Sequence, residues 1–188
     1  MSERNQPATP AAACALTLCL LLTACAGGGA PAAQEAAGEA AASDLERLLA
    51  IEEIGRLKAS YFRCLDTKDW ACIATLFTSD ATAVYNVEGS GDPATPDNPV
   101  TGNEAIAAFI QRAVEHLVTI HHGHMPEIEI TSPTTATGIW AMLDILQEPG
   151  GENLVHGWGH YHETYERIDG RWYIKTLRLT RLRVDRAE

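Results

Sequence analysis

The sequence predicts an α+β domain in which a curved antiparallel sheet wraps around three N-terminal helices. Apolar residues recur at three- and four-residue steps before residue 118 and at two-residue steps after it. A two-residue turn signal, Asp169-Gly170, joins the last two strand segments. Helices followed by a run of strands are typical of a sheet covered on one face by helices. With 188 residues, the chain is long enough for one domain with its own core.

Residues 1–25 predict a bacterial lipoprotein signal peptide. The apolar run at 11–22 (AAACALTLCLLL) is too short to span a bilayer and suits the centre of a signal peptide. The sequence LTAC that ends at Cys25 resembles a lipobox, which implies lipidation at Cys25 and anchoring in the cell envelope. Ala26 rather than Asp follows it, which implies the periplasmic face of the outer membrane. The alternative is an alanine-rich tail without a sorting role.

Residues 26–43 contain no aromatic and no large aliphatic side chain. Such a segment cannot bury enough surface to offset its ordering entropy, so it predicts an Ala/Gly-rich linker. Ser43 or Asp44 is a candidate N-cap for the first helix. The folded domain is therefore expected over residues 44–188.

The charge balance excludes two classes of partner. A formal net charge of −11 argues against nucleic-acid binding and against a basic helix lying on a membrane, since both need a surplus of Lys and Arg. Membrane association is therefore expected only through the lipid at Cys25.

The helices and the short segment between them follow in order. Four residues share one face of the first helix: Ile54, Leu57, Tyr61 and Leu65. A second helix is expected at 70–77, a short strand at 81–87 and a third helix at 103–116. Residues 88–101 hold two Gly and three Pro, so they predict a long exposed loop.

Four strands are expected over residues 118–130, 135–147, 154–168 and 172–184. The second of them is apolar on both faces, which places it centrally in the sheet. Cys64 and Cys72 are the cysteines left after the predicted processing. They could pair in an oxidising compartment, but small buried thiols are the favoured interpretation.

Four segments resemble the SnoaL-like branch of the nuclear-transport-factor-2-like superfamily: 51–70 (IEEIGRLKASYFRCLDTKDW), 119–130 (TIHHGHMPEIEI), 134–140 (TTATGIW) and 165–175 (YERIDGRWYIK). Within it the chain resembles bacterial bile acid 7α-dehydratase and, more distantly, scytalone dehydratase and hexachlorocyclohexane dehydrochlorinase. The resemblance covers essentially all of residues 44–185 and implies a cone-shaped fold. It says little about substrate, because this fold serves many functions.

The resemblance also implies a set of site residues. The family's catalytic histidine corresponds to His121 and its first-helix acid to Asp66. Its tyrosines correspond to Tyr61 and Tyr85, and its last-strand arginine to Arg181. The chain departs from the family at His122, at His160 and in the longer 88–101 loop.

These residues fit a cofactor-independent dehydratase acting on a hydrophobic, steroid-like or polycyclic hydroxy-ketone. The side chain of histidine suits a base at neutral pH, and a carboxylate on its other nitrogen would orient it. The alternatives are a ketosteroid-type isomerase or polyketide cyclase, and a non-catalytic envelope module that binds a hydrophobic ligand. Neither a metal nor an organic cofactor is expected. A homodimer or homotrimer is expected, with Trp158 and Trp172 as candidates for an outer sheet patch.

Each site residue also has a structural interpretation. Tyr61 could be core, and Arg181 could pair with an acid on the surface. Asp66 stands about 140° around an ideal helix from Tyr61, so both face one cavity only if the helix ends or kinks between them. On simple alternation His122, not His121, shares a face with Ile128, unless a bulge near Gly123 reverses the order.

A metal site is a further alternative. His122 and His124, and also His160 and His162, have the spacing that puts two imidazoles on one face of a strand. Such pairs also arise by chance in a histidine-rich sheet, and no metal is expected to be functional here.

Overall fold

The computed structural model describes residues 30–85, 99–151 and 154–187. The expected signal peptide with Cys25, and residues 88–98 of the expected loop, lie outside the described residues. Two units are distinguished, Met1–Gly38 and Glu39–Glu188, and the sheet and the cavity belong to the second. Within the described part of the chain, no helix combines the length and the apolar character that a membrane span requires.

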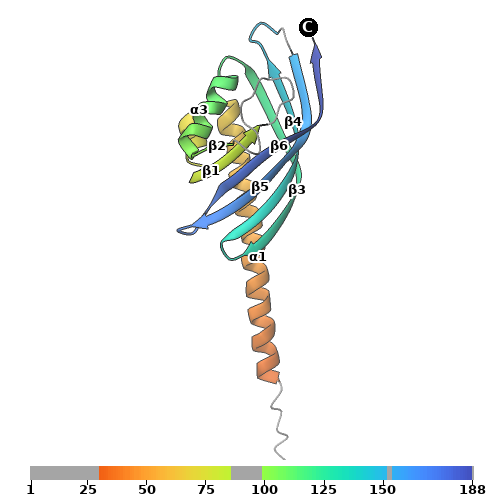
Figure 1. Cartoon of the computed structure of the whole chain (residues 1–188). Helices are drawn as coiled ribbons and strands as arrows, with labels where there is room; N and C mark the ends of the chain where they lie inside the picture. The colour runs from red at the N-terminus through yellow and green to blue at the C-terminus, as the bar shows by residue number, and fades with distance from the viewer. Residues whose placement is uncertain (1–29, 86–98, 152–153, 188) are drawn as a thin grey trace, which may run out of the picture. The chain divides into compact units, whose positions relative to one another are not determined.

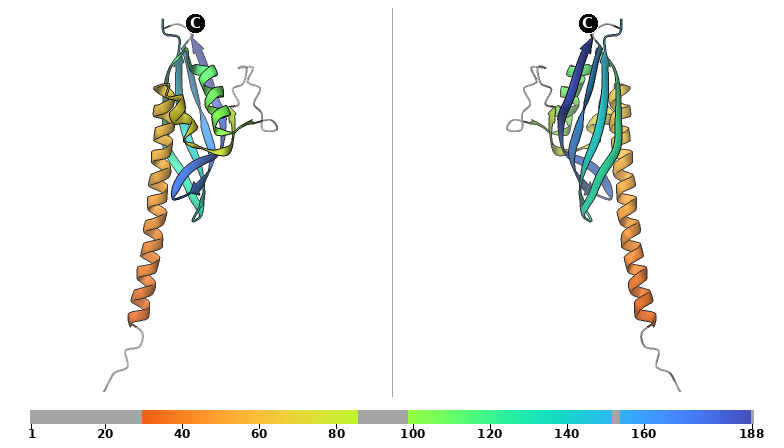
Figure 2. Two further views of the ribbon diagram at one scale, coloured as in Figure 1. Left: turned by 90° about the vertical axis from the view of Figure 1, so that its left-hand side faces the viewer. Right: turned by 90° about the vertical axis from the view of Figure 1, so that its right-hand side faces the viewer.

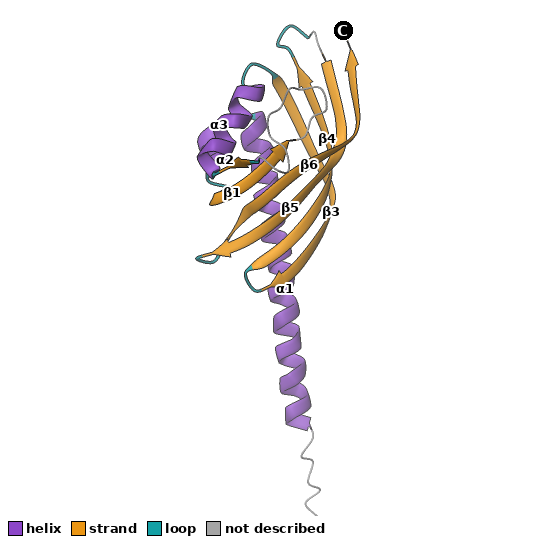
Figure 3. Ribbon diagram, in the orientation of Figure 1, coloured by secondary structure: helices purple, strands orange, loops and turns teal. Residues whose placement is uncertain are grey.

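The second unit contains a six-stranded sheet in the order β2-β1-β6-β5-β4-β3 (Figure 1). Its strands are β1 (Phe77–Tyr85), β2 (Val100–Thr101), β3 (Val118–Ser132), β4 (Thr135–Gln147), β5 (Leu154–Ile168) and β6 (Arg171–Ala187). All neighbouring strands are antiparallel except β1 and β6, which are parallel. The predicted α+β fold is confirmed, and Figure 3 shows the curvature of the sheet.

Helices α2 (Trp70–Ala74) and α3 (Asn103–Val114) lie together on one side of the sheet (Figure 2). The second helix is shorter than expected, and the first strand begins at Phe77 rather than at residue 81. Thr78 and Asp80 resemble a helix end in sequence, but they lie in β1, where Asp80 pairs with Lys175 across the sheet. Val100 and Thr101 form β2 inside the segment that was expected to be a loop.

Helix α1 spans Ala30–Asp66 and so begins well before the expected N-cap at Ser43 or Asp44. Residues 30–43 of the expected linker are therefore helical, and the expected start of the first helix is wrong. The error comes from treating low apolar content as disorder. Alanine has the highest helix propensity, and a helix satisfies its backbone internally without burying a face. The exposed side chains at 43–49 agree with a helix that is not yet part of a core.

The core lies between the second half of α1, the two shorter helices and the inner face of the sheet. Its fully buried members include Ile54, Tyr61, Ile73, Ile106 and Ile174. Trp172 also belongs to it at 3% exposure, so the expectation that it lies on an outer patch is wrong. Trp158 is half-buried on the opposite face, where Arg183 lies over its ring.

Cys64 and Cys72 form a disulfide that joins the last turn of α1 to α2. The favoured interpretation of two buried thiols is therefore wrong. A separation of eight residues is compatible with a disulfide because a turn between the two helices brings their Cα atoms to 5.9 Å.

A β-bulge in β3 decides which histidine faces inward. His124 is opposite Ala141 and Glu127 is opposite Ile139, so β3 holds one residue more than β4 between these pairs. Met125 in this bulge has a positive φ of 36°. The extra residue reverses the alternation, so His121 is buried although Ile128 faces inward too. His122 is exposed on the other face.

Candidate active site

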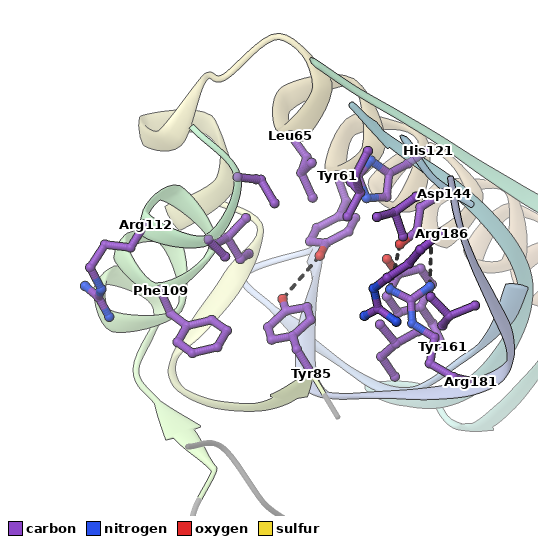
Figure 4. A pocket seen from close by; sticks show the side chains of 17 residues that line it. Tyr61, Leu65, Tyr85, Phe109, Arg112, His121, Asp144, Tyr161, Arg181 and Arg186 are labelled. Carbon is purple, nitrogen blue, oxygen red and sulfur yellow. Dashed lines mark hydrogen bonds and ion pairs between the residues drawn. The ribbon is translucent and has the colours of Figure 1, made fainter. Parts of the chain in front are cut away.

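A cavity of about 510 Å³ opens on the inner face of the sheet, within the range of small-molecule sites (Figure 4). Its walls come from α1, α3 and strands β1, β3, β4, β5 and β6. Nine of the 17 lining side chains are apolar: Leu65, Phe109, Ile110, Ala113, Val114, Leu146, Val155, Leu179 and Val184. Four of the five predicted site residues also line it: Tyr61, Tyr85, His121 and Arg181. Such a lining suits a ligand with an apolar body.

Asp66 and His121 are held together by two hydrogen bonds. The Nδ1 atom of His121 lies 2.7 Å from Oδ1 of Asp66, and its backbone N–H donates to Oδ2 at 2.8 Å. Thr119 donates to the same Oδ1 at 2.9 Å. Asp66 is the last residue of α1, so its side chain can reach β3 although Tyr61 faces the cavity. Asp66 therefore acts on the cavity through the imidazole.

The surroundings of this pair favour one protonation pattern. Partial burial alone would raise the pKa of Asp66, but the hydrogen bonds from the ring and backbone of His121, with that from Thr119, hold the pKa below its ordinary value. An ionised carboxylate accepts a hydrogen bond from Nδ1–H, which leaves Nε2 for the cavity. Phe62 stacks on the imidazole at 13° between planes. Asp66 and Phe62 therefore orient the ring, and an ionised Asp66 favours the Nδ1–H tautomer.

Tyr61 and Tyr85 meet at the cavity wall, with their hydroxyl oxygens 3.2 Å apart (Figure 4). Tyr61 is fully buried, and this burial, with the neighbouring phenol of Tyr85, raises its pKa well above 10. It therefore stays a neutral donor at any physiological pH. Tyr85 ends β1, and Phe109 stacks against its ring at 16°. One of the two phenolic protons lies in the bond between them, so each hydroxyl is positioned by the other.

Arg181 lines the cavity, but its guanidinium is bound by an acid that the sequence analysis did not single out. Its two terminal nitrogens donate to the two carboxylate oxygens of Asp144 at 2.8 and 2.7 Å. Asp144 is 2% exposed and lies directly opposite His121 in the β3–β4 register. Gly157 leaves the space for this pair, because a Cβ there would lie 2.1 Å from Oδ1 of Asp144.

Two further residues were missed. Tyr161 is buried and lines the cavity, and Glu163 forms an ion pair with Lys58 in which both side chains are fully buried. Glu163 also accepts from the hydroxyl of Tyr165. The sequence did contain features that could have pointed to Asp144 and Glu163. Asp144 is the one acid inside an apolar strand, and Glu163 shares its face with Tyr161.

The histidine pairs lie apart from this cavity. The rings of His122 and His124 are 6.1 Å apart and those of His160 and His162 are 6.2 Å apart, and none of the four lines it. Across the described ranges, the one group of three metal-ligand side chains within 4.8 Å is Cys64, Asp69 and Cys72. Its two sulfurs are already joined in the disulfide.

Comparison with known families identifies the class of this domain. The model of the SnoaL-like domain matches residues 46–178, so the chain belongs to the SnoaL-like family of the nuclear-transport-factor-2-like superfamily. Among curated proteins, it is 29% identical over 136 residues to the probable cyclase FGR4 of Gibberella zeae. The match covers 69% of this chain and 89% of that protein.

Solved structures share the fold. A candidate scytalone dehydratase from Novosphingobium aromaticivorans superposes with a TM-score of 0.66 at 22% identity, over 76% of this chain and 91% of that one. A type 2 hexachlorocyclohexane dehydrochlorinase (LinA) superposes with a TM-score of 0.66 at 22% identity, over 77% and 93%. The LinA-type3 protein of Novosphingobium barchaimii has a TM-score of 0.64 at 23% identity, over 77% and 94%.

Proposed function

We propose that this protein is a cofactor-independent lyase that removes water from a hydrophobic, steroid-like or polycyclic hydroxy-ketone. The observation that carries the proposal is the imidazole of His121, tied to Asp66 through Nδ1 and directed into an apolar cavity. The related proteins are named for cyclase, dehydratase and dehydrochlorinase activities, and proton removal from carbon suits that range.

In the proposed reaction, Nε2 of His121 takes a proton from the carbon next to the substrate's carbonyl. Asp66 stabilises the imidazolium that forms, and the hydrogen-bonded pair of Tyr61 and Tyr85 donates through one of its hydroxyls to the developing enolate or to the departing oxygen. The electron pair then forms the C=C bond as the C–O bond breaks. The imidazolium proton leaves with the hydroxide as water, directly or through a phenol, which restores the neutral imidazole.

A panel of polycyclic β-hydroxy ketones, followed by mass spectrometry, tests this proposal. The wild type should produce a compound lighter by one water. The variant His121→Ala should lose about 10²–10⁴ in kcat, the contribution typical of a positioned base. His122→Ala is the matched control, because it removes the neighbouring imidazole from the other face of the same strand. Full activity of His121→Ala on a substrate that the wild type dehydrates would refute the proposal.

Cyclisation or isomerisation is the second candidate, because one relative is named as a cyclase. Both reactions can begin with the removal of a proton from carbon, which His121 could perform. Product mass separates the two, because isomerisation conserves mass whereas dehydration does not. A product of unchanged mass whose formation depends on His121 would favour this second candidate.

For location, we propose that the mature protein is tethered to the periplasmic face of the outer membrane through lipid at Cys25. The lipobox-like sequence and the Cys64–Cys72 disulfide support this, because disulfides persist in oxidising compartments. Mass spectrometry of the mature N-terminus tests it. Cys25→Ala should release the protein from membranes, and an unmodified Cys25 in the wild type would contradict the proposal.

A further inference from the structure

The inner face of the sheet can be followed row by row toward the mouth of the cavity. Asp144 lies opposite His121 on β3 and opposite Gly157 on β5. The next row, two residues further along, runs through Leu146, Val155 and Arg186. Arg186 therefore follows an apolar wall outward from the His121 row, and its guanidinium lies over the cavity beside Arg181 in Figure 4.

The charges that line this cavity are unequal. Among the described residues that line it, Asp144 is the only acid, and both of its carboxylate oxygens are bound by Arg181. Arg112, on α3, and Arg186 are both exposed. Among the residues that the structure describes, neither has a carboxylate within ion-pair distance. Arg186 thus places a positive charge over the cavity in a chain of net charge −11, whereas the side chain of Arg112 points away from the cavity in Figure 4.

We propose that the ligand of this site is amphipathic, with an apolar body in the cavity and an oxyanion at the mouth that Arg186 binds. The inference rests on the proposed function and names the substrate class of the same site. An arginine fork matches the geometry of a carboxylate, sulfonate or phosphate group. The side chain of Arg112 extends outward from α3, so it is not expected to bond the ligand.

The expected gain is modest, because an exposed guanidinium keeps most of its water and is screened by salt. The anionic group should raise affinity by roughly three- to tenfold at low ionic strength. The charge of Arg186 should therefore distinguish anionic from neutral ligands whose apolar parts are similar. It does not replace the apolar contacts, which should account for most of the affinity.

Two fluorescent probes with nearly the same aromatic body test the proposal without any catalytic readout. Anilinonaphthalene sulfonate carries the anion and N-phenylnaphthylamine lacks it. Wild-type protein should bind the sulfonate more tightly, and Arg186→Gln should weaken sulfonate binding roughly three- to tenfold while leaving the neutral probe unchanged. Arg183→Gln is the matched control, because it removes an equal charge from a residue that does not line the cavity.

The variant Ala113→Trp tests whether the probes bind inside the cavity. Ala113 is exposed on α3 and lines the cavity, so an indole there should block both probes while the helix stays intact. Sulfonate binding that ignores Arg186→Gln, or that falls equally with Arg183→Gln, would overturn the inference. Failure of both probes to bind, or binding that survives Ala113→Trp, would overturn it as well. None of these outcomes bears on the His121 base, whose test is turnover.

Discussion

Two of the acid–base pairs that connect α1 to the sheet lie in the interior, and they differ in what surrounds them. Lys58 pairs with Glu163 of β5, and both side chains are 0% exposed. Eight residues later Asp66 pairs with His121 of β3, where the side chains are 25% and 6% exposed and the imidazole borders the cavity. The first pair is sealed in the core, whereas the second faces a space that a substrate could fill.

The sealed pair is saturated with partners. Glu163 accepts from Lys58 and from Tyr165, whose hydroxyl also accepts from Trp140 Nε1 at 2.8 Å. The ring of Tyr161 lies 3.6 Å from the Lys58 ammonium. Burial lowers the pKa of Lys58, and Glu163 opposes that shift. The Lys58–Glu163 pair is enclosed by other protein groups, which suits a structural role. The Asp66–His121 pair leaves one ring nitrogen toward the cavity, which suits the proposed chemistry.

Breaking the sealed pair should produce the largest loss of stability. Lys58→Met and Glu163→Gln should each lower the free energy of unfolding by about 3–5 kcal/mol, because each leaves a buried charge without its partner. The double variant should lose less than the sum of the two. Urea unfolding followed by circular dichroism measures this, and single losses below about 1 kcal/mol would show that the pair is not sealed.

Removing the disulfide should cause an intermediate loss of stability, and it should also disturb the Asp66–His121 pair. Cys64 and Cys72 close a short loop that contains Asp66. Cys64→Ala/Cys72→Ala should lower the unfolding free energy by about 2–3 kcal/mol through the entropy of the unfolded chain. Because the loop also positions Asp66, kcat should fall more than KM rises. An unchanged kcat in the folded double variant would show that α1 fixes Asp66 without the disulfide.

The smallest expected effect is the dependence of stability on acid at Asp66. Its lowered pKa means that the ionised carboxylate stabilises the folded state fully above the ordinary value of 3.8, and that this stabilisation is lost as pH falls through the folded value. Asp66→Asn should therefore be less stable than the wild type near neutrality and approach it below that window. A stability difference between the wild type and Asp66→Asn that stays the same at all pH values would contradict the account.

The fold was largely predictable from the sequence because periodicity and turn signals are local. Asp169 and Gly170 have φ of 50° and 81°, as a two-residue hairpin turn requires, and the bounds of β4 and β5 follow the change of period. The start of α1 was not predictable from the absence of apolar residues. Helix propensity in an alanine-rich segment does not depend on a core.

The site was only partly predictable, because its geometry depends on contacts between distant residues. Alternation along β3 favoured His122, and only the bulge at Met125 turns His121 inward. The resemblance to the family pointed to His121, but no local pattern could show that Arg181 would be held by Asp144, since the two lie on different strands with β5 between them. Register across a sheet is a tertiary property that a single strand does not reveal.

The central claim is that His121 presents an unprotonated Nε2 to the cavity because Asp66 holds the proton on Nδ1. Nitrogen-15 NMR of the imidazoles at neutral pH tests it most directly, with the His121 signals assigned from a His121→Gln sample. The account predicts the Nδ1–H tautomer in the wild type and a mixture of tautomers in Asp66→Asn. An Nε2–H tautomer, or a spectrum that Asp66→Asn leaves unchanged, would contradict it.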